Sequence, residues 1–262
     1  MPGRHIEATM DGVTLPSGII IREVHEDPAT LEVLNGERPG RPGQLVLGNR
    51  RLSRKVTIEC VITEIHNLQT RAAKADALAQ WARGTALAVN YRTNQVLHGH
   101  CTADPSLGEV RDYTSPLRIE FTADMIPYWE DTSDYTKTIS LKDGISSFTA
   151  PGTAPTPVRL EIQPTGGTMT TFSFTIAKTQ AGLTTGQKIT LENMTVGTNQ
   201  TIYIDRDERD NLYIRVGNAS AMSLRTPESA DDLIAYGGTT NYIQWASNVA
   251  HSTKLYCRGR WL

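Results

Sequence analysis

The strongest candidate for chemistry in this sequence is the cluster His98-Gly99-His100-Cys101. Imidazole and thiolate groups bind metals, and a closed zinc site needs four such ligands. On a strand, His98 and His100 share one face while Cys101 points to the other, so at most two ligands converge. No second cluster is visible in the sequence. We therefore interpret the two histidines as residues of a surface or a subunit contact, and we predict no metal site.

A second candidate is the charged segment 205–211, whose acidic residues superficially resemble a calcium loop. Arg209 occupies the third liganding position, glycine is absent at the sixth, and Val216 stands where a bidentate glutamate belongs. These departures favour a solvated hairpin turn.

Catalytic signatures are also missing. The sequence holds no Gly-x-Ser-x-Gly, no phosphate-binding glycine loop and no His-Glu-x-x-His. Asp231 and Asp232 are adjacent, as in a turn, and neither Cys60 nor Cys101 has an activating base nearby in the sequence. We predict no catalytic residue and no cofactor, and hence a protein that is not an enzyme.

Composition and charge exclude further classes of function. The 262 residues include 26 basic and 28 acidic side chains, and the net charge of −2 gives no support for binding nucleic acid through phosphate neutralisation. The first residues form no apolar leader, and no run approaches the roughly 20 apolar residues of a membrane helix. The sequence predicts synthesis in the cytoplasm, no membrane insertion and three reduced cysteines.

These side chains must be positioned by local structure, and the clearest elements lie between residues 54 and 131. Val56, Ile58, Cys60 and Ile62 alternate with less apolar neighbours, as in a half-buried strand. A helix is expected over residues 68–83, with Asn67 as its N-cap and Gly84 just past its end. Its expected apolar stripe consists of Leu68, Ala72, Ala75, Leu78, Ala79 and Ala82. A hairpin then joins a strand beginning at residue 87 to a return strand over residues 96–102, which makes an α+β unit.

Residues 26–49 differ from their surroundings, because proline and glycine recur throughout. Proline and glycine at this density interrupt regular secondary structure, so the segment is predicted to be a long extended arm in which residues 45–47 pair as a strand. Five arginines lie in or just after the arm, namely Arg38, Arg41, Arg50, Arg51 and Arg54. Two interpretations stay open for this basic region: charges that protect a strand edge, or contacts with another subunit or a channel.

The second half of the chain predicts strands only. A Pro- and Thr-rich linker over residues 134–157 separates an N-terminal domain, 1–133, from a β-sandwich over 158–262. Strands recur about every ten residues in the sandwich. Exposed aromatic side chains there would suit a sugar or a partner protein, and the candidates are Tyr236, Tyr242 and Trp245. Tyr203 and Tyr213 fall next to positions that face the core.

The order of elements in the N-terminal half resembles the distal tail proteins of long, non-contractile-tailed bacteriophages. The resemblance rests on the Arg-Arg region that enters the strand 55–65, the helix ending in Trp81-Ala82-Arg83-Gly84, and the hairpin 87–101. It ends with the strand 117–123 running into Asp124-Met125-Ile126-Pro127-Tyr128-Trp129. The pattern covers about half the chain, and the second half looks like the family's galectin-like domain.

The resemblance implies a mainly β protein that forms a ring, typically of six copies, at the tip of a phage tail. It implies that the ring continues the tail-tube channel and acts as an attachment hub. The implied partners are further copies of the chain, the tail tube protein, the tail-associated hub protein, the tape measure protein and receptor-binding proteins. A carbohydrate-binding, host-recognition minor tail protein is the alternative.

Overall fold

The computed structural model describes residues 5–37, 44–63, 67–102, 116–207 and 210–262. The chain forms two compact units, the first from residue 1 to 130 together with Leu262 and the second from 131 to 261. Both are built mainly from antiparallel strands, as predicted, and the described residues contain a single α-helix. That helix is not long and apolar enough to cross a membrane.

Two small sheets carry the first unit. One has the order β8-β7-β1-β2, and the other has the order β3-β6-β10-β9. Their strands are β1 (Ala8–Met10), β2 (Val13–Thr14), β3 (Ile19–Asp27), β6 (Arg54–Ile62), β7 (Ala86–Val89), β8 (Gln95–His98), β9 (His100–Cys101) and β10 (Pro116–Ala123).

The predicted alternation in β6 is confirmed. Val56, Ile58, Cys60 and Ile62 are all buried, and β10 lies beside them in antiparallel register. The tight turn between β1 and β2 places Asp11 and Gly12 at positive φ, which is the backbone of a two-residue hairpin.

The helix α1 (Leu68–Trp81) begins where the sequence indicates, because the Asn67 side chain accepts hydrogen bonds from the backbone N–H groups of Gln69 and Thr70. Its buried face differs from the predicted stripe. Ala75, Leu78 and Ala82 are buried as expected, but Ala72 is exposed. The side chains of Arg71 and Trp81 take part in the buried face instead. The Trp81 indole donates to the Val13 carbonyl and so ties the helix to the β1–β2 hairpin.

The predicted return strand over 96–102 is divided at Gly99 into β8 and β9, which belong to different sheets. A side chain at Gly99 would collide with the backbone, since a Cβ there would lie 2.2 Å from the Thr122 carbonyl oxygen. The close approach of two backbones at this point requires glycine.

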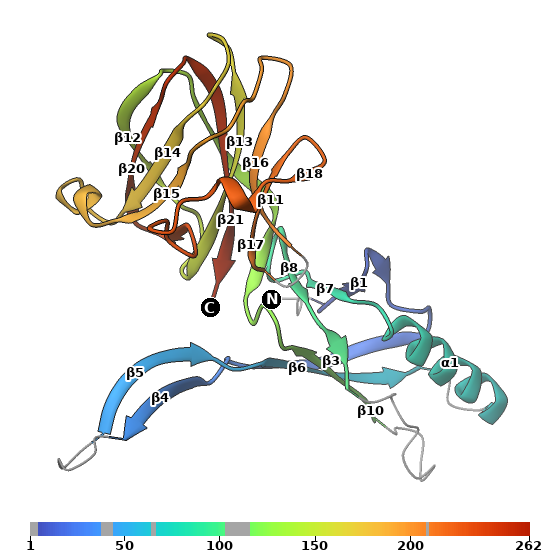
Figure 1. Ribbon diagram of the computed structural model, residues 1–262. Helices are drawn as coiled ribbons and strands as arrows, with labels where there is room; N and C mark the ends of the chain where they lie inside the picture. Colours follow the sequence, from blue (N-terminus) through green and yellow to red (C-terminus); the bar gives the residue numbers. More distant parts are fainter. Residues whose placement is uncertain (1–4, 38–43, 64–66, 103–115, 208–209) are drawn as a thin grey trace. The chain divides into compact units, whose positions relative to one another are not determined.

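The arm predicted over residues 26–49 is structured as a β-hairpin. Strand β4 (Leu31–Glu37) pairs with β5 (Gln44–Arg51), and among the described strands these two pair only with each other. Figure 1 shows this two-stranded ribbon continuing from the β3–β6 ladder.

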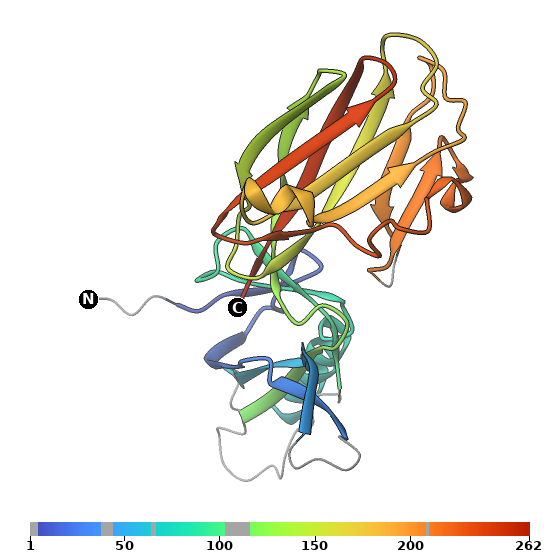
Figure 2. The same cartoon turned by 60° about the vertical axis from the view of Figure 1, so that its left-hand side comes forward.

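In the second unit, two antiparallel sheets form a sandwich, seen as two layers in Figure 2. One sheet has the order β18-β17-β16-β13-β21-β11, with β19 beside β13, and the other has the order β12-β20-β14-β15. The strands are β11 (Trp129–Ile139), β12 (Asp143–Thr149), β13 (Pro155–Pro164), β14 (Phe172–Ala177), β15 (Gln187–Leu191), β16 (Ile202–Arg206), β17 (Leu212–Val216), β18 (Ala219–Ser220), β19 (Ile234–Tyr236), β20 (Thr240–Ser247) and β21 (His251–Trp261).

Apolar side chains from both sheets form one core. Phe174 and Trp245 come from one layer, and Leu160, Ile204 and Leu255 come from the other. The segment 134–157, predicted as a linker, lies inside this unit and consists largely of β11, β12 and the start of β13. Its prolines and threonines occupy strands and turns of the sandwich, because tertiary pairing overrides the local composition.

Candidate functional site

The described residues hold no group of three or more side chains that could bind a metal ion. His98 is exposed, and His100 lies 3.7 Å from Asp124 on an exposed surface. Cys60 and Cys257 are buried, and desolvation raises the pKa of each thiol to about 12, so both stay protonated and unreactive near neutral pH.

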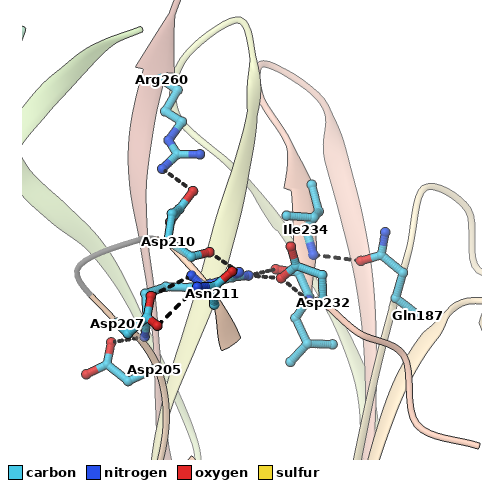
Figure 3. Close-up of polar contacts among 10 residues, drawn as sticks. Gln187, Asp205, Asp207, Asp210, Asn211, Asp232, Ile234 and Arg260 are labelled. Atoms are coloured by element: carbon cyan, nitrogen blue, oxygen red, sulfur yellow. Dashed lines mark hydrogen bonds and ion pairs between the residues drawn. The ribbon is translucent and has the colours of Figure 1, made fainter. Parts of the chain in front are cut away.

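The acidic segment 205–211 is organised around arginine. Figure 3 shows the Asp207 carboxylate accepting hydrogen bonds from the backbone N–H and the side-chain amide of Asn211, at 2.9 and 3.1 Å. The Arg206 guanidinium donates to the Asp210 carbonyl and pairs with Asp232. Arg260 pairs with the Asp210 carboxylate. Guanidinium groups pair with Asp210 and Asp232, and Asn211 satisfies Asp207, so the described residues of this segment have the contacts of a structural turn. Residues 208–209 lie outside the described part of the chain.

The Glu26 carboxylate, near the end of β3, joins several segments among the described residues of the first unit. It accepts hydrogen bonds from the Tyr91 hydroxyl at 2.8 Å, the Trp129 indole at 3.1 Å and two nitrogens of Arg92 at 2.7 and 3.0 Å. Arg54 lies 3.6 Å away on β6. The Arg92 guanidinium also lies over the Trp129 ring, 5.0 Å from its centre. These contacts join four separate segments beside the base of the β4–β5 hairpin.

The surroundings of Glu26 determine whether its carboxylate is ionised. Burial alone would raise the pKa of Glu26, but the hydrogen bonds from Arg92, Tyr91 and Trp129 outweigh it and lower the pKa. Burial also lowers the pKa of Arg54, which the nearby Glu26 charge opposes. Glu26 is therefore an ionised anchor at the base of the hairpin.

The predicted contact arginines take different places. Arg38 and Arg41 lie outside the described residues. Arg50 is exposed and pairs with Glu32 across the hairpin, while Arg51 is half-buried and donates to the Ala29 carbonyl. Arg54 is only 2% exposed. Its assignment to a subunit or channel surface is wrong, because its side chain lies inside the first unit beside Glu26.

The β4–β5 hairpin exposes a row of apolar side chains. Leu31, Val33 and Leu34 on β4 are 50%, 49% and 39% exposed, although strand residues of this type normally face a core. Leu31 lies directly opposite Arg51. Because side chains alternate along a strand, Leu31 and Val33 form the apolar row on one face, and Leu34 lies on the other face. Exposed apolar side chains on a two-stranded ribbon are typical of a surface that contacts another molecule.

The predicted aromatic platform in the second unit does not form around Trp245. This side chain is 6% exposed, belongs to the sandwich core and donates its indole N–H to the Leu141 carbonyl. Tyr236 is half-buried, with the Lys178 ammonium 3.8 Å from its ring centre, and Tyr242 is half-buried on the outer face of β20. The tryptophan is therefore unavailable to a sugar, which corrects the prediction.

A polar face that sequence reasoning missed lies on the other sheet of the sandwich. Arg215 stacks 3.9 Å from the Tyr203 ring centre on neighbouring strands. Arg159 pairs with Asp134, and the Tyr256 hydroxyl donates to Glu161. The alternation of Tyr203 and Tyr213 with core residues was the available signal, since it places such side chains on the outer face.

This chain resembles known proteins in its fold but hardly in its sequence. No protein-family model matches the sequence, and no curated protein matches it. Among solved structures, the chain is similar to the Dit protein (gp 19.1) of phage SPP1, described as a paradigm of the hub adsorption apparatus in Gram-positive-infecting phages. The TM-score is 0.73 at 11% identity, over 98% of this chain and 99% of that one. The fold is therefore that of a Dit protein, along nearly the whole of both chains.

Two chains from the phage P2 baseplate in its activated conformation, one with Ca and one with Sr, are also similar. Each is 8% identical over 97% of both chains, with TM-scores of 0.46 and 0.44. No conclusion rests on likeness at that level.

Proposed function

We propose that this chain is a structural distal tail protein at the tail tip of a long-tailed phage. The observation that carries the proposal is the match of both units, in order, to the SPP1 Dit protein over 98% of the chain. A structural role agrees with the exposed apolar strand surface of the first unit. The proposed protein is not an enzyme and uses no cofactor.

In this proposal the first unit is the ring-forming domain, and copies of the chain, six by analogy, contact one another through it. A closed ring uses two different, complementary faces of each subunit. The exposed apolar row on β4 supplies one surface that gains by being covered. The ring would continue the tail-tube channel, with the tail tube protein on one face, the hub protein on the other and the tape measure protein within reach.

The second unit, as a galectin-like domain, is the proposed attachment site for receptor-binding or other baseplate proteins. Its Arg- and Tyr-rich outer face supports this role, because these two residue types are enriched where proteins bind tightly. The alternative of a carbohydrate-binding protein loses its tryptophan platform, since Trp245 is buried.

Size-exclusion chromatography with light scattering, followed by negative-stain imaging, tests the proposal. We expect a discrete ring-shaped oligomer of the full chain, either alone or after co-expression with the products of neighbouring genes. A chain that stays monomeric at every concentration, with and without those products, would contradict it.

A further inference from the structure

A second apolar surface lies in the first unit, between β1 and β3. It is a groove of about 370 Å³, within the size range of ligand pockets. Its lining includes Ile6, Ala8 and the three consecutive residues Ile19, Ile20 and Ile21. Ile20 is 48% exposed, and β3 is an edge strand of its sheet, so among the described strands only β6 pairs with it.

The groove and the apolar row of β4 lie at opposite ends of one ladder. Strand β3 pairs with β6 from Ile19 to Asp27, and the hairpin begins only beyond Asp27. Eight residue steps at about 3.3 Å separate the two ends by about 26 Å. The hairpin therefore cannot fill the groove of its own chain without dismantling the β3–β6 ladder that carries it.

Charge supports a match between the two surfaces. Arg51 lies opposite Leu31 on the face that carries Val33. Glu7 lines the groove, is exposed, and makes no ion pair with the residues that the structure describes. A cation beside the apolar row thus corresponds to an anion beside the apolar groove.

We propose that the groove between β1 and β3 of one copy receives Leu31 and Val33 from the hairpin of a second copy of this chain, with Arg51 directed to Glu7. The inference rests on the proposed function, since it names the contact that joins neighbours in the ring. Because the donor and acceptor surfaces are different, each copy gives one contact and receives another, which is what a closed head-to-tail ring requires.

Cysteine cross-linking of the full-length chain tests the pairing. We expect the double variant Ile20→Cys/Val33→Cys to give a ladder of covalent oligomers after mild oxidation, which collapses on reduction. Each single variant should give dimers at most. The matched control is Met125→Cys/Val33→Cys, because Met125 is 64% exposed in the same unit but does not line the groove. The control should give no ladder.

Charge reversal provides an independent test by sedimentation. Glu7→Arg and Arg51→Glu should each weaken association by about ten-fold, and the double variant should recover most of the loss. Recovery distinguishes a direct pair from local damage, because Arg51 also contacts Ala29 within its own hairpin. Rings that form without the ladder and without recovery would overturn this inference and leave the proposed function standing. A chain that never assembles would overturn both.

Discussion

At the scale of single residues, Glu26 shows how one carboxylate can hold several segments together. Its side chain faces two arginines, a phenol and an indole that come from different parts of the sequence. Arg54 is only 2% exposed, and its Nε is buried without a partner. Removing the Glu26 charge would therefore leave this buried cation without the anion that these contacts supply.

We therefore expect Glu26→Gln to destabilise the first unit by about 3 kcal/mol, as for other broken buried pairs. Denaturant unfolding followed by tryptophan fluorescence measures this loss, because Trp129 contacts the cluster. Exposed Glu23, on the same strand, provides the control Glu23→Gln, for which we expect a change within about 0.5 kcal/mol. Equal effects of the two variants would refute the anchoring role.

His251 makes the second unit sensitive to acid. Its ring is 1% exposed, its Nδ1 lies 2.9 Å from the Thr253 hydroxyl, and its Nε2 is buried without a partner. Desolvation lowers the pKa of this imidazole, so the unfolded chain takes up the proton at a higher pH than the folded chain does.

Stability of the second unit should thus be unaffected by His251 above about pH 6.5 and decline as the pH falls below it, by at most about 1.4 kcal/mol per pH unit. Denaturant unfolding at pH 7 and pH 5 should show a smaller decline for His251→Gln than for the unchanged protein. His98→Gln, at an exposed position, should leave the decline unaltered. An identical pH dependence in all three proteins would exclude this role.

At the scale of elements, glycine at one position decides how a strand is divided between sheets. Gly99 separates β8 from β9, and its backbone lies too close to Thr122 for any side chain. We expect Gly99→Ala to cost about 1–3 kcal/mol, as overpacking typically does, because a backbone carbonyl cannot rotate away.

Thermal or denaturant unfolding checks this cost against Gly182→Ala. The nearest atom to a Cβ at Gly182 is the Thr179 hydroxyl oxygen, 3.0 Å away, and a side chain can move. The control should shift stability by about 0.5 kcal/mol or less. A harmless Gly99→Ala would mean that the two sheets can separate at this point.

At the scale of the whole molecule, we expect the β4–β5 hairpin to be dispensable for folding and essential for the proposed assembly. Its two ends lie side by side, since the Leu52 N–H donates to the Thr30 carbonyl at 2.8 Å. Replacing residues 31–51 by an Asn-Gly turn should therefore preserve the β3–β6 ladder below it.

We expect this shortened chain to fold with an unchanged near-ultraviolet spectrum and to remain monomeric under conditions in which the full chain assembles. Light scattering measures the mass. When the shortened chain is co-expressed with the full chain, its incorporation should stop oligomer growth and reduce the yield of complete rings. A shortened chain that still forms the same ring would exclude the hairpin from the subunit contact.

Several features follow from local sequence alone. The alternation in β6, the Asn67 cap of α1 and the tight Asp11-Gly12 turn were all predictable, because each depends on residues close together in the chain. The prolines and glycines of residues 26–49 likewise predicted an extended arm, but not that β4 and β5 pair along it.

Only the tertiary structure decided the environment of individual side chains. Arg54 and Trp245 carry the residue types of contact sites, yet both are buried, Arg54 beside Glu26 and Trp245 between two sheets. Their partners lie 28 and 104 positions away along the chain, as the Glu26 and Leu141 contacts show. Periodicity tells which side of a strand a residue faces, whereas burial depends on which distant segments the folded chain brings to that side.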